Sequence, residues 1–198
     1  MVDFKVNQKT EQMQQSMQEL LKANLELKMK SSLDSLTGIP NRRHIDEYID
    51  GIWDEAKKKN QSVGIAIIDA DFFKRINDNY GHDAGDCALI KIAEMLAETT
   101  DGVASMVGRY GGEEFIAVFY NRNINEVLKV LESFRETLER LEIQYKEAVL
   151  KITVSMGLAF TIPKNDLQIR DLVRKADTKL YEAKKNGRNN LVYVELNS

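Results

Sequence analysis

Arg109-Tyr110-Gly111-Gly112-Glu113-Glu114-Phe115 joins two apolar stretches that are typical of β-strands, residues 103–107 and 115–120. Paired glycines between such stretches indicate a hairpin, because Gly111 and Gly112 tolerate positive φ angles and leave no side chain against a ligand. Glu113 and Glu114 then lie at the turn, where a metal ion or a hydroxyl proton can reach their carboxylates. This segment alone also fits a surface hairpin with solvated acids, so the rest of the chain must decide between the two.

A second apolar stretch, residues 63–68, runs directly into Asp69-Ala70-Asp71. Its composition predicts a strand that is buried on both faces. Side chains alternate along a strand, so the two aspartates project on the same side. One of them, together with a glutamate of the hairpin, would offer the oxygen ligands that Mg²⁺ prefers beside a nucleoside triphosphate. Either aspartate could take that role, provided that the hairpin lies beside the strand.

Phe72-Phe73-Lys74 follows the acids and opens a short helix expected near residues 74–79. Backbone N–H groups at the start of a helix, with a lysine beside them, form a cradle for phosphate. The alternative for the two phenylalanines is core packing, and we expect it to hold for at least one of them.

The remaining patterns predict a mixed α/β chain. Helices are expected at residues 41–59, 83–98, 124–141 and 169–183, and strands at 151–160 and 191–194. This order of elements predicts an α+β fold in which helices flank a central, mostly antiparallel sheet.

Residues 1–32 contain no Pro or Gly and carry a repeat of seven residues. The d positions are Val6, Met13, Leu20 and Leu27, and the a positions are Thr10, Met17 and Asn24. The repeat predicts a parallel, dimerising coiled-coil helix, and a polar residue at a would favour a defined register. The alternative is a helix that docks on its own domain through Leu21, Leu25 and Met29. We therefore divide the chain into a helix, 1–32, and a globular domain, 33–198.

Charge and cysteine content exclude several classes of protein. The net charge of the 198 residues is −3, so the basic surface expected for binding a nucleic acid polymer is missing. Cys87 is the single cysteine, which excludes an internal disulfide and a cysteine-rich zinc site. The chain has no secretory signal pattern and no apolar run near the roughly 18 residues of a membrane span. We expect a cytoplasmic protein with no membrane segment.

Together these segments resemble the GGDEF domain of bacterial diguanylate cyclases, in its GGEEF variant. The resemblance covers about residues 34–194, and its motifs occur in the order of the family. They are Asp34-Ser35-Leu36-Thr37-Gly38-Ile39-Pro40-Asn41-Arg42-Arg43, residues 68–78, Gly81-His82-Asp83-Ala84-Gly85-Asp86, residues 109–115, and Tyr181-Glu182-Ala183-Lys184-Lys185-Asn186-Gly187-Arg188-Asn189.

The resemblance implies a fold like the palm of nucleotide cyclases and polymerases, and the condensation of two GTP to cyclic di-GMP with release of two pyrophosphates. It implies two Mg²⁺ (or Mn²⁺) ions per active site, held by Asp69, Glu113 and the backbone carbonyl of Ala70. Glu114 would assist metal binding or deprotonate the attacking 3′-hydroxyl. Lys74 would be catalytic through its contact with phosphate. The substrate-binding residues implied are Phe72, Phe73, Gly111, Gly112, Lys184 and Arg188 on the phosphate side, and Asn77, Asp86 and His82 on the guanine side.

Some positions of these motifs also have a purely structural interpretation. Asp71 fits a residue that braces its motif, so we expect Asp69 as the metal ligand. Lys184 and Arg188 near Gly187 fit favourable charges at a capped helix C-terminus. Asp86 fits an acid in the first turn of a helix that opens at Asp83, and His82 fits a structural residue of the preceding turn.

Many relatives carry an Arg-x-x-Asp set that binds the product and inhibits the enzyme. Here those positions are Gly102-Val103-Ala104-Ser105, so we predict that this feedback site is absent. The resemblance also implies one GTP per domain and hence a homodimer, which the N-terminal helix would hold together under an upstream sensor domain outside this chain. Two alternatives stay open: a GTP-binding regulatory module of low activity, and a cyclase with relaxed base specificity.

Overall fold

The computed structural model describes residues 13, 16–19, 32–164 and 167–196. It divides into two units, Met1–Leu33 and Asp34–Ser198. In the first unit, the described residues 13 and 16–19 are helical. Most positions of the predicted heptad repeat, and the alternative apolar stripe beside it, lie outside the described residues. The coiled coil therefore stays a prediction.

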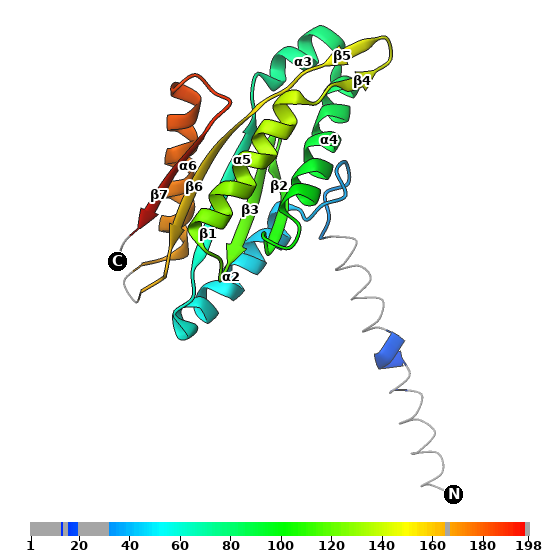
Figure 1. Cartoon of the computed structure of the whole chain (residues 1–198). Helices are drawn as coiled ribbons and strands as arrows, with labels where there is room; N and C mark the ends of the chain where they lie inside the picture. Colours follow the sequence, from blue (N-terminus) through cyan, green and yellow to red (C-terminus); the bar gives the residue numbers. More distant parts are fainter. Residues whose placement is uncertain (1–12, 14–15, 20–31, 165–166, 197–198) are drawn as a thin grey trace, which may run out of the picture. The chain divides into compact units, whose positions relative to one another are not determined.

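The second unit combines helices and strands along the chain (Figure 1). Its helices are α2 (Arg42–Lys59), α3 (Phe73–Tyr80), α4 (His82–Thr100), α5 (Ile124–Arg140) and α6 (Ile169–Lys185). Its strands are β1 (Val63–Ala70), β2 (Met106–Gly111), β3 (Glu114–Tyr120), β4 (Ile143–Tyr145), β5 (Ala148–Leu150), β6 (Val154–Thr161) and β7 (Leu191–Leu196).

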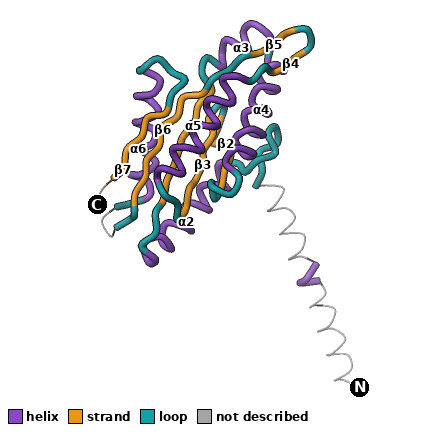
Figure 2. The backbone as a smooth tube through the Cα atoms, viewed as in Figure 1, coloured by secondary structure: helices purple, strands orange, loops and turns teal. Residues whose placement is uncertain are grey.

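The main sheet has the strand order β2-β3-β1-β6-β7. All neighbours are antiparallel except β6 and β7, which run parallel. The predicted central, mostly antiparallel sheet is therefore confirmed. β1 occupies the middle, and all eight of its residues are buried, as its continuous apolar composition predicted. Figure 2 shows the strands side by side with helices on both faces.

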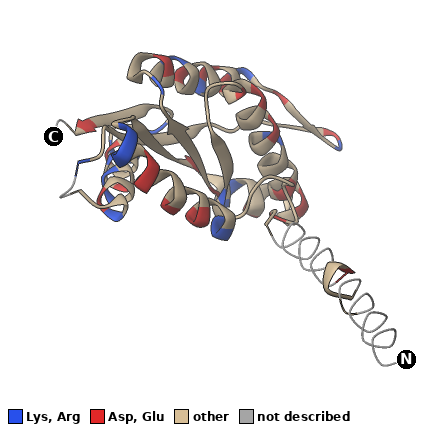
Figure 3. Cartoon of the chain, turned by 90° about the horizontal axis from the view of Figure 1, so that it is seen from below, with Lys and Arg blue, Asp and Glu red and all other residues tan. Residues whose placement is uncertain are grey.

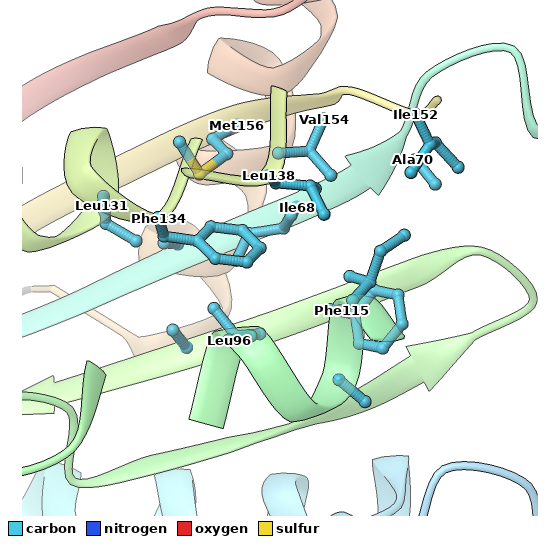
Figure 4. Packing of buried hydrophobic residues seen from close by; sticks show 14 of the residues in the cluster. Ile68, Ala70, Leu96, Phe115, Leu131, Phe134, Leu138, Ile152, Val154 and Met156 are labelled. Carbon is cyan, nitrogen blue, oxygen red and sulfur yellow. The ribbon is translucent and has the colours of Figure 1, made fainter. Parts of the chain in front are cut away.

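Two hydrophobic cores lie on opposite faces of this sheet, because alternate residues of each strand point to opposite sides. On one face, Ile68 and Phe115 pack with Leu96 of α4 and Phe134 of α5 (Figure 4). On the other face, residues such as Ile67 pack against α2 and α6. Helices thus cover both faces of the sheet, and the acidic segment Asp69–Asp71 lies where β1 ends.

Several predicted bounds are wrong for local reasons. Residues 103–105 belong to the turn after α4, since the N–H groups of Val103 and Ala104 both donate to the Thr100 carbonyl. Residues 151–153 precede β6, because the pairing of β1 with β6 ends at Ala70 and Val154. The two-stranded β4–β5 sheet was not predicted, since strands of three residues are too short to show an alternating pattern.

Candidate active site

The β2–β3 hairpin lies directly beside the acidic end of β1. Asp69 pairs with Glu114 across the two strands, and the N–H of Ala70 donates to the carbonyl oxygen of Glu113 at 3.2 Å. Gly112 takes a φ of +50° at the turn, a backbone conformation that glycine adopts without steric cost. The condition that the sequence set for a metal site, adjacency of hairpin and strand, is therefore fulfilled.

Asp69 is buried and pairs with a lysine from the far end of the chain. Its side chain is 10% exposed, and its Oδ2 lies 2.8 Å from Nζ of Lys184. Burial raises the pKa of Asp69, and the neighbouring Glu113 and Glu114 act in the same direction, whereas Lys184 lowers it; the net direction is upward. A buried carboxylate in this position is stabilised by a cation.

Asp71 has a different environment, although it projects from the same side of the chain as Asp69. Its carboxylate accepts hydrogen bonds from Ser155 Oγ at 2.6 Å, from Thr153 Oγ1 at 2.8 Å and from the backbone N–H of Asn189 at 3.0 Å. These bonds join β1, β6 and the loop after α6. They agree with the interpretation of Asp71 as a brace.

The two phenylalanines after Asp71 separate into one partly buried and one exposed side chain. Phe73 packs against the core, so the expectation that at least one would do so is confirmed. Phe72 is 48% exposed and has a φ of +54°. The guanidinium groups of Arg75 and Arg188 lie 4.4 and 4.6 Å from the centre of its ring. Lys74 is exposed in the first turn of α3, a helix whose start no side chain caps.

Asn77 of α3 lies against α4 at Gly85, the residue before Asp86. Its Oδ1 is buried without a hydrogen-bond partner among the described residues, and a Cβ added at Gly85 would approach this atom to 2.0 Å. Gly85 is thus a site residue to which the sequence gave no role, although it lies within one of the quoted motifs. Asp86 and His82 are exposed. Because α4 begins at His82, Asp86 falls in the second turn and not, as predicted, in the first.

The C-terminal end of α6 reaches the site because this helix packs unusually close to β6. A Cβ at Gly157 would lie 2.1 Å from the backbone N of Leu180 and 2.2 Å from the carbonyl oxygen of Ala176. Glycine therefore lets the helix backbone contact the strand. As a result, Lys184 pairs with Asp69, and Arg188 Nε lies 4.0 Å from Asp71. Both basic residues therefore interact with acidic side chains of another segment, in addition to any interaction with the helix C-terminus.

Arg109 connects the hairpin to the start of the globular unit, a role that sequence reasoning missed. Its Nη1 pairs with Asp34 at 3.0 Å, its Nε donates to the Gly112 carbonyl at 2.9 Å, and its backbone N–H donates to the Pro40 carbonyl at 2.9 Å. The signal was available, because Arg109 and Asp34 both belong to quoted motifs. Only their separation of 75 residues hid the contact.

The residues at this site fit a hard divalent cation. Asp69, Glu113, Glu114 and the Ala70 carbonyl are all oxygen donors, and Lys184 shows that a cationic group can lie against Asp69. In the described part of the chain, no three acidic, histidine or cysteine side chains already converge as a ligand set. Mg²⁺ does not require this, since it usually retains several waters and binds one or two carboxylates together with substrate phosphates.

A cavity of about 600 Å³ opens next to the hairpin, on the face covered by α2 and α6. Glu114, Tyr110 and Asp46 line it, whereas Asp69, Asn77 and Lys184 do not. The ion pair of Asp69 and Lys184 at the centre of the candidate site therefore lies outside this cavity. Figure 3 shows that charged residues lie mainly on helices and loops, with the strands largely uncharged. Among the described helices, none has the length and apolar character to cross a bilayer.

The family described as "Diguanylate cyclase, GGDEF domain" matches residues 31–190 of this sequence. The chain belongs to the GGDEF family of diguanylate cyclases. This GGDEF chain is 38% identical over 141 residues to diguanylate cyclase A of Treponema denticola. The aligned region covers 71% of this chain and 37% of that protein. It is 34% identical over 169 residues to diguanylate cyclase DgcZ of Escherichia coli (strain K12). The aligned region covers 85% of this chain and 55% of that protein.

The GGDEF fold also matches a solved structure of the coiled coil and GGDEF domain of DgcB from Caulobacter crescentus, which is in complex with c-di-GMP. The TM-score is 0.85, with 96% of this chain and 99% of that chain covered. The sequence identity of 24% makes this a likeness of fold. The GGDEF chain spans between 37% and 55% of the lengths of the two curated relatives above.

Proposed function

We propose that this GGDEF domain condenses two GTP molecules into cyclic di-GMP and releases two pyrophosphates. One observation supports the proposal most: Asp69 at the end of β1 lies beside the Glu113–Glu114 turn and contacts Lys184 of α6. Three distant segments thus bring together acids suited to divalent metals and a base suited to phosphate. Nucleotidyl transfer needs this combination, because its catalysis is mostly positioning and charge stabilisation.

GTP would bind with its guanine toward α3 and α4 and its phosphates toward the loop before α3. Asp86 would accept hydrogen bonds from N1 and N2 of guanine, beside Asn77 and His82. Adenine lacks these donors, so ATP would leave the carboxylate unsatisfied. Lys74, Lys184 and Arg188 would neutralise the phosphates, together with the backbone N–H groups of Phe72 and Phe73, while Gly111 and Gly112 leave room for the nucleotide.

Asp69, Glu113 and the Ala70 carbonyl would hold two Mg²⁺ or Mn²⁺ ions, with help from Glu114. When bound, these ions would polarise the α-phosphate and lower the pKa of the attacking 3′-hydroxyl. Glu114 would accept the proton of that hydroxyl. Lys184, which pairs with Asp69 at 2.8 Å, would exchange this carboxylate for a phosphate group of GTP.

Each domain would hold one GTP, so bond formation requires a second copy of the chain facing the first. The N-terminal helix, 1–32, would raise the effective concentration of the two half-sites. An upstream sensor domain would act on this helix and change the relative rotation of the domains.

The test is to incubate the protein with GTP, with ATP and with both, in each case with Mg²⁺, and to identify the products by mass spectrometry. Cyclic di-GMP from GTP alone supports the proposal. Adenine-containing dinucleotides would indicate relaxed base specificity, and nucleotide binding without product at high protein concentration would indicate a regulatory module.

Glu114→Ala provides the variant for this test. We expect turnover to be lost while the protein stays folded, because Glu114 lies at the start of β3 beside the turn. Glu147→Ala, which removes an exposed glutamate from the turn between β4 and β5, is the matched control. Circular dichroism checks the fold, and retained turnover in Glu114→Ala would transfer the proton-accepting role to Glu113 or to solvent.

A further inference from the structure

Asp71 is enclosed by hydrogen-bond donors to an extent that its neighbour Asp69 is not. Its side chain has no exposed surface, and the hydroxyls of Ser155 and Thr153 and the N–H of Asn189 donate to its two oxygens. A carboxylate offers about four lone-pair directions. Three are occupied, and Arg188 Nε lies 4.0 Å from Oδ1. Because the side chain has no exposed surface, the surrounding groups would have to move before a metal ion could reach the remaining direction.

The loop to which Asp71 is bonded has an unusual backbone. Arg188 and Asn189 have φ angles of +66° and +47°, the left-handed region that non-glycine residues rarely adopt and that surrounding contacts must hold in place. The hydrogen bond from Asn189 N–H to Asp71 lies within this left-handed pair. On either side, Arg188 N–H donates to the Ala183 carbonyl, and the Asn190 carbonyl accepts from Met156 N–H. Two further side-chain bonds hold the loop, from Arg135 Nη1 to Asn189 Oδ1 at 3.0 Å and from Asn190 Nδ2 to the Ala183 carbonyl at 3.3 Å. Asp71 is the carboxylate that accepts directly from the backbone of the left-handed pair.

The same loop carries the guanidinium of Arg188 to the ring of Phe72. Phe72 follows Asp71 in the chain and is itself left-handed, with a φ of +54°. Asp71 thus connects two left-handed segments, one in the loop before α3 and one after α6. Both segments contain residues to which the proposed function gives phosphate contacts, and we expect both to move if Asp71 loses the hydrogen bonds that it accepts.

We propose that Asp71 is a positioning residue that fixes the Arg188 loop for binding the pyrophosphate portion of GTP, and that it is not a metal ligand. The inference rests on the proposed function, because it assumes that Arg188 binds phosphate. It assigns different roles to the two aspartates of Asp69-Ala70-Asp71. Asp69 would bind the metal, and Asp71 would position Arg188, which in turn would bind phosphate.

The experiment uses the full chain with Asp71→Asn, which keeps the shape of the side chain but replaces one acceptor oxygen by a donor. Two ligands are measured separately: inorganic pyrophosphate by calorimetry in Mg²⁺ buffer, and Mn²⁺ by electron paramagnetic resonance without nucleotide. We expect pyrophosphate affinity to fall about tenfold while Mn²⁺ affinity changes by less than about twofold. If Asp71 had only a general structural role, the affinities for pyrophosphate and for Mn²⁺ would fall together.

A double-mutant cycle with Arg188→Ala completes the test. If Asp71 acts through Arg188, Asp71→Asn has little further effect on pyrophosphate binding once Arg188 is removed. An undiminished effect in that background, or a loss confined to Mn²⁺, overturns the inference. If Arg188→Ala itself leaves pyrophosphate binding unchanged, the phosphate assignment in the proposed function fails instead.

Thr153→Val keeps the test decisive if Asp71→Asn does not fold. This change removes one hydroxyl that donates to Asp71 and leaves the carboxylate intact. We expect a smaller fall in pyrophosphate affinity in the same direction, again with Mn²⁺ binding preserved. Unchanged pyrophosphate binding in Thr153→Val, or weakened Mn²⁺ binding, contradicts the positioning role.

Discussion

Asp69 carries a protonation equilibrium that would compete with the proposed metal binding. Burial raises the pKa of its carboxyl above the ordinary value of 3.8, in spite of Lys184. The folded protein therefore binds this proton more tightly than the unfolded chain does. As a result, the free energy of unfolding falls as the pH rises from about 3.8 through the folded-state pKa. In the absence of metal, the ionised Asp69 lowers stability, and a bound cation would offset this loss.

We expect Asp69→Asn to be inactive but more stable than the wild-type protein at pH 7 in metal-free buffer. The advantage should shrink as the pH falls through the raised pKa of Asp69, because its carboxyl then takes up a proton. Chemical denaturation across this pH range measures the difference. Asp101→Asn, which changes an exposed carboxyl in the turn after α4, is the control. A less stable Asp69→Asn at pH 7 would mean that the contact with Lys184 outweighs burial.

Gly85 lies inside α4, where glycine lowers stability by about 0.5–1 kcal/mol relative to alanine. The structure gives the reason for its presence, since a Cβ would lie 2.0 Å from Asn77 Oδ1 and 3.0 Å from the Phe73 ring. Glycine keeps the Asn77 amide in place at the expense of helix propensity.

Gly85→Ala should therefore move Asn77 without unfolding the protein. We expect KM for GTP to rise on the order of ten- to a hundredfold, since a displacement of about 1 Å can cost this much. Steady-state kinetics measure KM, and Gly51→Ala in α2, where no atom lies within 4 Å of the added Cβ, is the matched control. An unchanged KM would mean that Asn77 does not contribute to guanine binding.

At the level of helices and strands, the packing of α6 places Lys184 beside Asp69. Gly157 lets α6 contact β6, and Leu180 and Ala176 of the helix are buried there. The apolar spacing of α6 was evident in the sequence. The closeness of its approach depends on a single glycine in another element, which no pattern within the helix reveals.

We expect Gly157→Ala to destabilise the fold by about 1–3 kcal/mol, the usual cost of overpacking a core. The added Cβ meets helix backbone at 2.1–2.2 Å, so α6 must shift and carry Lys184 away from Asp69. Denaturant unfolding measures the stability, and turnover of GTP at saturating protein concentration should fall in parallel. Normal turnover in a destabilised Gly157→Ala would show that the position of Lys184 does not limit the reaction.

Two units make up the chain, and the proposed reaction needs two copies of it. Turnover per protein molecule should therefore fall on dilution, because half-sites separate as dimers dissociate. Removing residues 1–32 should move this fall to higher protein concentration without abolishing activity. Initial rates over a dilution series, with analytical ultracentrifugation at the same concentrations, measure both effects. Rates independent of concentration in the shortened chain would contradict the role of the N-terminal helix.

The sequence by itself determined the long elements and the two-sided sheet, because periodicity is a local property, and its motifs predicted which acids and bases form the site. Alternation along the strand could not separate Asp69 from Asp71, since it places both on one side; the preference for Asp69 rested on the resemblance to the family. The tertiary structure made that distinction by placing Lys184 beside one aspartate, and the Thr153 and Ser155 hydroxyls and the Asn189 N–H around the other. These partners come from segments more than 80 residues away. A carboxylate's function depends on the groups that surround it, and only folding brings those groups together.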